Sequence, residues 1–224
     1  MTPEPDPGVL EARARQSRGT SGDAIYTAAS AALRRRGARG DVLDVGCGSG
    51  RFGTFIPDLC GSYRGVDAVR YDGFPDDAIL LKADLDREPL PLADASIDVV
   101  VSLETVEHLE SPRAFCRELV RVLRPGGWLL VTTPNQRSLL SLGSLFLKGH
   151  FSAFQDNNYP AHQTALLDTD LQRIARENAL ADIAIEFTCT GRMPLTARAC
   201  PQALSRAFPR AFSDNVLLLG RKPA

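Results

Sequence analysis

The fold of this chain is decided by the stretch Asp41-Val42-Leu43-Asp44-Val45-Gly46-Cys47-Gly48-Ser49-Gly50. Its first half has the apolar character of a short buried strand. The three glycines at alternate positions then predict a tight turn, because glycine adopts positive φ and has no Cβ to hold a ligand away from the backbone. The stretch therefore predicts a strand that ends in a ligand-binding loop.

The charge beside this loop favours one kind of ligand. Asp44 lies at the end of the strand, directly before the turn. Loops that cradle phosphate usually continue with a Lys and a Ser or Thr, and no Lys follows these glycines. A carboxylate in this position suits a ligand with a cationic end.

The composition of the whole chain excludes several classes of protein. A chain of 224 residues with 44% hydrophobic and 24% charged residues is typical of a globular domain. The net charge of −1 gives no basic field that would attract nucleic acid. No apolar run reaches membrane-spanning length, so we expect no stable membrane insertion. Five cysteines, an odd number without a CxxC pair, predict a reducing, cytoplasmic location.

Helical and strand-like segments alternate outward from the first strand. Residues 1–8 are rich in Pro and are expected to form a disordered tail before a single domain at 9–224. Helices are predicted at 9–18, 22–36, 51–59, 112–123 and 169–178, and strands at 42–45, 63–66, 78–82, 97–102, 128–133, 183–189 and 216–219. This alternation predicts an α/β fold with a doubly wound sheet of seven strands, mostly parallel, whose last strand is antiparallel.

Two further acids follow the second and third strands. Asp67 comes 21 residues after Gly46, where a carboxylate can accept hydrogen bonds from both ribose hydroxyls of a nucleotide. This spacing fits NAD as well as S-adenosylmethionine (SAM), and Gly48-x-Gly50-x-x-Gly53 also matches the dinucleotide fingerprint. SAM is favoured for three reasons. The Asp44 carboxylate would lie beside the negatively charged pyrophosphate of NAD, whereas it suits the cationic end of SAM. Asp84 can accept from an adenine amino group, and no second domain is expected to bring a hydride acceptor.

Together these segments resemble the class I SAM-dependent methyltransferases, which have a Rossmann-like fold. The resemblance covers roughly residues 40–135 and is carried by residues 43–50, 65–67, 83–85, 98–102, 104–109 and 123–127. It implies that Asp44 and the turn with Gly46, Cys47, Gly48 and Gly50 hold the methionine part of SAM. It also implies that Asp67 binds the ribose, that Asp84 and the amide of Leu85 bind the adenine, and that the carbonyl region of Leu103 faces the sulfonium.

The segment Glu104-x-x-Glu107-His108 follows the fourth strand and is the candidate reactive rim. Spacings of three and four residues would place these side chains on one face of a helical turn. They could bind a divalent metal such as Mg²⁺, completed by His162, and this resembles the metal-using ubiquinone-biosynthesis O-methyltransferases and small-RNA 2′-O-methyltransferases. Alternatively, no metal binds, Glu107 pairs locally, and His108 or His162 acts as a base or orients the substrate.

Two apolar segments exceed a minimal fold of this kind, at 137–162 and 190–214. They could form a substrate lid, pack on the core or make a dimer interface, and membrane contact is disfavoured because 139–147 is poor in basic residues. The sequence thus predicts a monomeric or homodimeric SAM-dependent methyltransferase that acts on a small molecule, at a hydroxyl oxygen. The alternatives are methylation at N or C, a catalytically silent SAM- or nucleotide-binding module, and an NAD-linked oxidoreductase.

Overall fold

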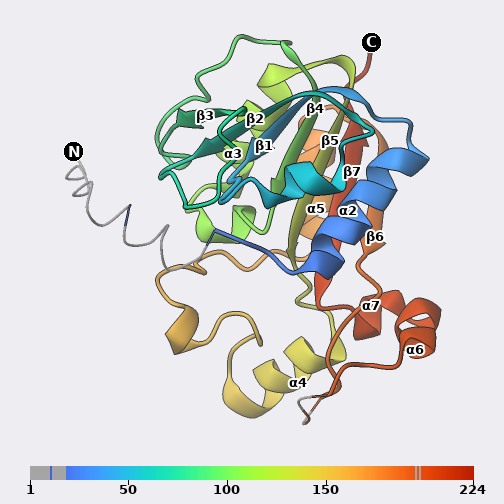
Figure 1. Cartoon of the computed structure of the whole chain (residues 1–224). Coiled ribbons are helices and arrows are strands. Elements are labelled where there is room, and N and C mark those ends of the chain that lie inside the picture. Colours follow the sequence, from blue (N-terminus) through green and yellow to red (C-terminus); the bar gives the residue numbers. More distant parts are fainter. Residues whose placement is uncertain (1–10, 12–18, 195, 197) are drawn as a thin grey trace.

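A computed structural model of the chain describes residues 11, 19–194, 196 and 198–224 (Figure 1). The tail expected at 1–8, and all but one residue of the helix expected at 9–18, lie outside the described residues. The helix expected at 22–36 is present as α2 (Asp23–Arg35).

One seven-stranded sheet forms the centre of the molecule, in the order β3-β2-β1-β4-β5-β7-β6. Five strands are parallel neighbours, whereas β7 is antiparallel to both β5 and β6. This confirms the predicted fold class and the antiparallel last strand. The strands are β1 (Gly40–Val45), β2 (Cys60–Asp67), β3 (Ile79–Lys82), β4 (Ile97–Leu103), β5 (Leu123–Pro134), β6 (Ala181–Phe187) and β7 (Asn215–Arg221).

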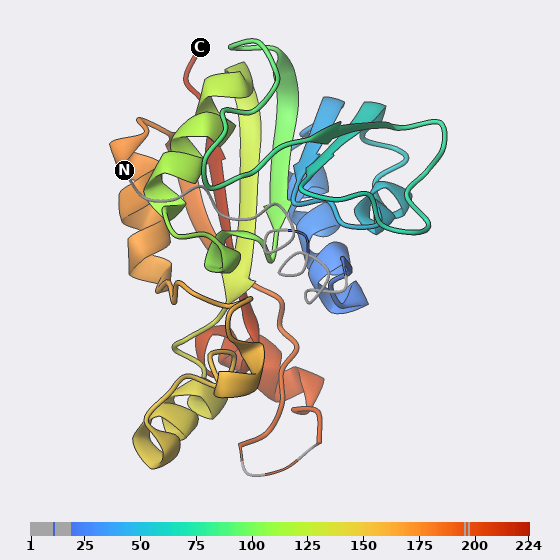
Figure 2. The same ribbon diagram turned by 90° about the vertical axis from the view of Figure 1, so that its left-hand side faces the viewer.

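Side chains alternate between two cores, one on each face of the sheet. Leu43 and Val100 pack with α3 (Pro112–Val122) and α5 (Asp168–Glu177) on one face. Val42 and Val101 pack with α2 and Phe52 on the other. Figure 2 shows these helices on opposite sides of the sheet. The strands are therefore buried on both faces, as their continuous apolar character predicts.

The expected helix at 51–59 is wrong. The chain forms only a short 3₁₀ helix, η1 (Arg51–Phe55). Pro57 has no N–H to donate to a preceding carbonyl, and its ring clashes with a helical turn before it, so a regular helix does not continue through this position. Phe52 is nevertheless fully buried against α2, so the segment still covers its face of the sheet.

The two segments beyond the minimal fold form a lobe apart from the sheet and the helices that cover it. We call it the distal lobe (137–162 and 190–214). It contains α4 (Leu139–Lys148), η3 (Asp156–Asn158), α6 (Gln202–Ala207) and α7 (Pro209–Phe212). It extends past the carboxyl ends of the parallel strands (Figures 1 and 2). The buried carboxylate of Asp168, at the start of α5, joins the lobe to the body through ion pairs with Arg137 at 3.2 Å and Arg210 at 3.1 Å. Among the described helices, none has the length and apolar character needed to cross a membrane.

Candidate functional site

A cavity of about 430 Å³ opens at the carboxyl ends of β1, β2 and β4. The chain leaves β1 toward one edge of the sheet and β4 continues toward the other, which is where open α/β sheets bind ligands. The cavity is lined by most of the residues expected from the sequence: Asp44, Gly46, Cys47, Gly48, Asp67, Asp84, Leu85, Leu103, Glu104, Glu107, His108 and His162.

The glycine turn is packed too tightly for side chains. Gly46 has φ +76°, and a Cβ there would lie 2.1 Å from the hydroxyl oxygen of Thr105. Gly48 has φ +53°, and its Cβ would lie 2.0 Å from the carbonyl oxygen of Gly19. Both glycines are therefore required by protein contacts, in addition to any approach of a ligand. Gly50 does not line the cavity; its Cβ position faces Pro75 and Phe74.

Asp44 is a buried carboxyl group at the base of the cavity. The phenol of Tyr63 donates a hydrogen bond to its Oδ2 at 2.6 Å. Burial raises the pKa of Asp44 to about 7, a shift that the Tyr63 hydrogen bond opposes and the nearby charge of Asp67 increases. A cationic ligand beside this carboxyl group would restore its ionised form. Burial also raises the pKa of the neighbouring Cys47 thiol, so Cys47 lines the cavity as a neutral thiol.

Asp67 and Asp84 form the other end of the expected cofactor site. Asp67 Oδ2 accepts a hydrogen bond from the backbone N–H of Gly48 at 2.9 Å, which ties the end of β2 to the glycine turn. Burial raises the pKa of Asp67, and the backbone hydrogen bonds from Gly48 and Val69 oppose that shift. Asp84 caps its own loop by accepting from the N–H of Asp86 at 3.0 Å. Both residues line the cavity, as expected for groups that would contact a bound nucleoside.

Sequence reasoning missed a segment that closes one side of the cavity. Residues 19–22 line it together with Ile25 and Tyr26 of α2. The carbonyl oxygen of Gly19 accepts a hydrogen bond from Ser49 N at 2.9 Å, so this segment is held directly on the glycine turn. The sequence signal was Gly19-Thr20-Ser21-Gly22, a turn-forming run immediately before the helix.

The rim after β4 is not the helical turn that the sequence predicted. Glu104 has φ +52°, outside the helical region, and only Val106–His108 form a 3₁₀ turn, η2. The Glu104 carboxylate accepts from Thr132 at 2.8 Å and from Asn215 at 2.6 Å. Burial raises the pKa of Glu104 to about 7. Because both oxygens of Glu104 have partners on β5 and β7, it does not join the other three rim residues, and the expected set of four ligands becomes three.

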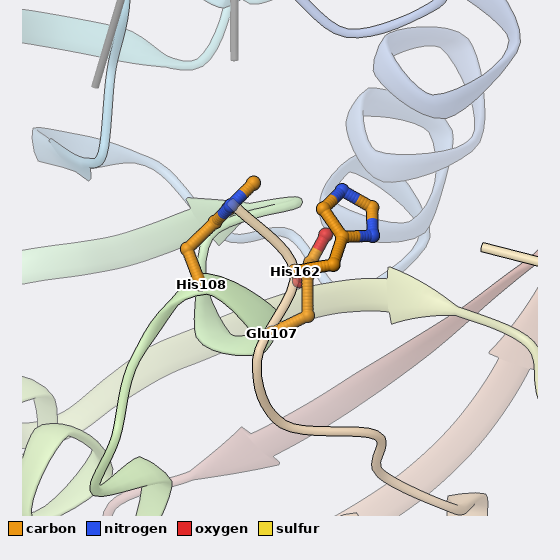
Figure 3. A group of neighbouring side chains, drawn as sticks. All are labelled: Glu107, His108 and His162. Carbon is orange, nitrogen blue, oxygen red and sulfur yellow. The ribbon is translucent and has the colours of Figure 1, made fainter. Parts of the chain in front are cut away.

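Glu107, His108 and His162 do come together at the rim (Figure 3). Their nearest ligand atoms all lie within 4.8 Å of one another. The two imidazole rings meet edge to face, with centroids 4.8 Å apart. Glu107 Oε2 accepts from Thr133 at 3.1 Å, while Oε1 is buried without a hydrogen-bond partner in the described part of the chain. Burial and the nearby Glu104 carboxylate raise the pKa of Glu107 well above its ordinary value.

The two histidines have different proton arrangements. His108 Nδ1 lies 2.7 Å from the carbonyl oxygen of Ala161. A carbonyl can only accept, so Nδ1 carries the proton in the neutral ring and the basic lone pair is on Nε2. Burial lowers the pKa of His162, a shift that a backbone hydrogen bond at Ala153 opposes. His162 Nδ1 is buried and has no partner within the described residues.

The chain around His162 is joined to η2 by several hydrogen bonds. The carbonyl oxygen of Glu107 accepts from the N–H groups of Gln163 and Thr164, at 2.9 and 3.0 Å. The hydroxyl of Thr164 donates to the carbonyl of Leu109 at 2.6 Å. The nearby Asn157 and Asn158 also line the cavity, whereas no described residue of 190–214 does. Of the two expected lid segments, the first reaches the site, and the second does not do so with any residue that the structure describes.

Comparison with known proteins relates the chain to methyltransferases. Residues 43–131 match the family described as "Methyltransferase domain". The chain is 40% identical over 107 residues to a probable SAM-dependent methyltransferase of Mycolicibacterium smegmatis, covering 46% of this chain and 42% of that protein. It is 29% identical over 157 residues to a ubiquinone biosynthesis O-methyltransferase of Idiomarina loihiensis, covering 64% and 63%.

The fold comparison gives the same class. A SAM-dependent methyltransferase from Archaeoglobus fulgidus superposes with a TM-score of 0.60 at 21% identity, over 88% of this chain and 94% of that one. The chain therefore has the class I methyltransferase fold. Residues 43–131 are similar to the methyltransferase-domain family, and the chain is related in sequence to SAM-dependent methyltransferases. In the four relatives that are 37–41% identical to this chain, the matched region spans less than half of the relative's length.

The contact between Gly48 and Gly19 can be tested with two alanine variants. Gly48→Ala should push the 19–22 segment off the turn and weaken SAM binding by at least about tenfold, measured by titration calorimetry. Gly73→Ala is the matched control, because Gly73 also has positive φ (+85°) but its Cβ would meet nothing within 4 Å. Equal SAM affinity in the two variants would show that this contact does not shape the site.

The raised pKa of Asp44 predicts a pH-dependent cofactor affinity. Below pH 7 the carboxyl group is largely protonated and loses its attraction for the cationic end of SAM, whereas above pH 7 it is ionised. SAM affinity should therefore fall by about tenfold between pH 8 and pH 6. Asp44→Asn should bind weakly at both pH values, whereas Asp41→Asn, on the same strand but away from the cavity, should keep the wild-type profile. A wild-type affinity that does not change with pH would contradict this assignment.

Proposed function

We propose that this chain transfers the methyl group of SAM to a hydroxyl oxygen of a small-molecule acceptor. The observation that carries the proposal is one cavity lined at one end by Asp44, Asp67 and Asp84 and at the other by Glu107, His108 and His162. The first group suits a nucleoside with a cationic amino-acid end. The second offers proton acceptors where the acceptor molecule would lie.

The residues of the cavity suit a displacement reaction. SAM, when bound, supplies a methyl group on a positively charged sulfur, which leaves as a neutral thioether when the acceptor oxygen forms its bond to the methyl carbon. The protein has to align the two partners and exclude water. The hydroxyl proton needs an acceptor, and the neutral His108 ring has its basic lone pair on Nε2. His162 packs edge to face on His108 and limits the position of that ring.

The walls near the rim indicate an acceptor of mixed polarity. Asn157 and Asn158 offer amide donors and acceptors in the segment that contains His162, whereas Leu109, next to His108 in the chain, offers apolar surface. Such a wall suits an aromatic or aliphatic compound with one or more hydroxyl groups. The similarity to ubiquinone biosynthesis O-methyltransferases supports oxygen as the methylated atom.

Glu107, His108 and His162, which we call the rim triad, also have the types of side chain that bind a divalent metal ion. Glu107 Oε1 and His162 Nδ1 are both buried without hydrogen-bond partners among the described residues, and buried polar atoms of this kind are normally satisfied. One carboxylate and two imidazoles fit Mg²⁺ poorly and Mn²⁺ or Zn²⁺ better, because imidazole is a softer ligand than oxygen. Glu107, His108 and His162 would hold the ion, which would orient the oxygens of the acceptor and favour loss of the hydroxyl proton.

Methyl transfer can be tested with SAM labelled in its methyl group. Purified protein would be incubated with acceptors grouped by nucleophilic atom: phenols and alcohols, amines, and carbon acids. We expect label in a hydroxyl acceptor, and we expect Asp67→Ala to lose SAM affinity by about 1.5–3 kcal/mol because a hydrogen bond to a charged group is lost. Tight SAM binding without transfer to any group would indicate a silent binding module, and transfer only to amines would replace oxygen by nitrogen.

The role of the rim triad has a separate test. If a metal binds there, EDTA should abolish transfer while SAM binding remains, Mn²⁺ should restore it, and paramagnetic resonance should detect bound Mn²⁺ that is lost in Glu107→Gln but kept in the exposed control Glu110→Gln. If the histidines act without a metal, EDTA should have no effect and His108→Ala should lower kcat by about 10²–10⁴-fold. Full activity in EDTA and in both histidine alanine variants would exclude the triad from the reaction.

A further inference from the structure

A tyrosine that does not line the cavity reaches the buried acid at its base. Tyr63 lies on β2, level with Val42 of β1, which is two residues before Asp44. Residues two apart on a strand share a face of the sheet. The side chains of Tyr63 and Asp44 therefore lie on the same face, and the phenol donates to Oδ2 of Asp44 at 2.6 Å. Tyr63 thus contacts the site from behind.

The Tyr63 ring is held in place by packing on both the sheet and η1. The ring is partly buried and packs on the core cluster that contains Phe52. A Cβ at Gly53 would lie 3.4 Å from the ring, so the ring rests against the backbone of η1. Gly53 is the last glycine of the Gly48-x-Gly50-x-x-Gly53 spacing, and it does not line the cavity. Its role in this fold is to make room for Tyr63.

The hydrogen bond from Tyr63 gives the two oxygens of Asp44 different roles. Burial and the charge of Asp44 raise the pKa of Tyr63, so the phenol keeps its proton and can always donate to Oδ2. None of the described residues donates a hydrogen bond to Oδ1, although Asp44 is only 2% exposed. Asp44 lines the cavity. Oδ1 is therefore the oxygen left to accept from a ligand.

The other groups around Asp44 give it no positive charge. The titratable groups that face it, besides Tyr63, are Asp67 of β2, Cys47 of the turn and Tyr26 of α2. The charge of Asp67 raises the pKa of Asp44, and burial raises the pKa of Cys47 and of Tyr26, so both stay neutral. On the other side of β1, β4 places Val101 level with Asp44.

The cation on η1 does not change this balance. Arg51, whose charge acts on Tyr26, is paired with Asp23 at 2.8 Å. The Tyr63 hydrogen bond opposes the effect of burial on Asp44 and favours the ionised form of its carboxyl group. The ability of Asp44 to attract a cation therefore depends on Tyr63.

We propose that Tyr63 is a positioning residue for the cofactor: its phenol fixes the Asp44 carboxylate so that Oδ1 faces the cationic amino-acid end of SAM. Tyr63 acts through Asp44 and touches no ligand itself. The proposal rests on SAM as the cofactor and is independent of the methyl acceptor. A ligand that lacks the amino-acid end of SAM should therefore bind equally well with and without the phenol.

Titration calorimetry with two ligands tests this proposal. S-adenosylhomocysteine has the amino-acid end, whereas 5′-methylthioadenosine has the same nucleoside and thioether without it. Tyr63→Phe keeps the ring and removes only the hydroxyl. We expect it to weaken S-adenosylhomocysteine binding by about tenfold, because a hydrogen bond to a charged group is lost. Binding of 5′-methylthioadenosine should stay at the wild-type level. A similar loss for both ligands would show a merely structural role and overturn the proposal.

Combination with an Asp44 variant tests whether Tyr63 acts through that residue. Asp44→Asn should itself weaken S-adenosylhomocysteine binding, and adding Tyr63→Phe should then cause little further loss, because the two side chains form one unit. Independent, additive losses would contradict the proposal.

The pH dependence of binding gives a second readout. The hydrogen bond from Tyr63 lowers the pKa of Asp44, which is about 7 with the phenol present. Removing the phenol raises that pKa, so the carboxyl group stays protonated to a higher pH. In Tyr63→Phe, the rise of S-adenosylhomocysteine affinity with pH should therefore occur at higher pH than in the wild type. An unchanged profile would overturn the proposal.

Tyr159→Phe is the matched control. Tyr159 is 70% exposed on the distal lobe and does not line the cavity, so this variant should bind both ligands like the wild type. An equal effect of the two tyrosine variants would also overturn the proposal. A wild-type protein that binds no S-adenosylhomocysteine would contradict both the cofactor and the role of Tyr63. Selective loss of binding in Tyr63→Phe, without methyl transfer to any acceptor, would support this inference and contradict only the proposed function.

Discussion

Three contacts that leave no room for a Cβ hold the site together. The turn after β1 packs at Gly46 against Thr105 of the rim and at Gly48 against the carbonyl of Gly19. On β2, a Cβ at Gly65 would lie 2.5 Å from the sulfur of Cys47 in that same turn. The first two positions also require positive φ, so alanine would be strained there even without a neighbour. The rim, the turn, β2 and the 19–22 segment are thereby fixed relative to one another.

This close packing buries carboxyl groups that have no cationic partner among the described residues. Asp44, Asp67 and Glu107 are all less than 9% exposed, and the side chains that donate to Asp44 and Glu107 are the uncharged hydroxyls of Tyr63 and Thr133. Burial of a carboxylate without an opposite charge is costly, and it raises the pKa of all three groups. A ligand with positive charge relieves that cost when it binds. These buried carboxyl groups thus favour a cationic ligand over a neutral or anionic one.

The sequence predicted the sheet, and it predicted several of the residues that line the cavity, because both depend on local signals. Strands buried on both faces appear as apolar runs, and Asp44, Asp67 and Asp84 each follow one of them. The sequence-based prediction was wrong or incomplete where contacts between distant residues determine the local structure. The helical turn expected at Glu104 does not form, because Thr132 and Asn215 on two other strands hold its carboxylate. The helix expected at 51–59 was wrong for a local reason, because Pro57 is incompatible with a regular helix there. The contact of Gly19 with the glycine turn was missed because it joins residues about 30 positions apart.

The hydrogen bonds between η2 and residues 161–164 divide the chain between β5 and α5 into two parts that tolerate substitution differently. Ala161, Gln163 and Thr164 are bound to His108, Glu107 and Leu109 through backbone atoms of at least one partner. Substitutions here would displace His108 and His162 even if no side chain in the cavity changed. Residues 139–149 have no hydrogen bond to these rim residues within the described part of the chain, and none of them lines the cavity. Insertions or exchanges in that stretch would therefore leave the positions of Glu107, His108 and His162 unchanged.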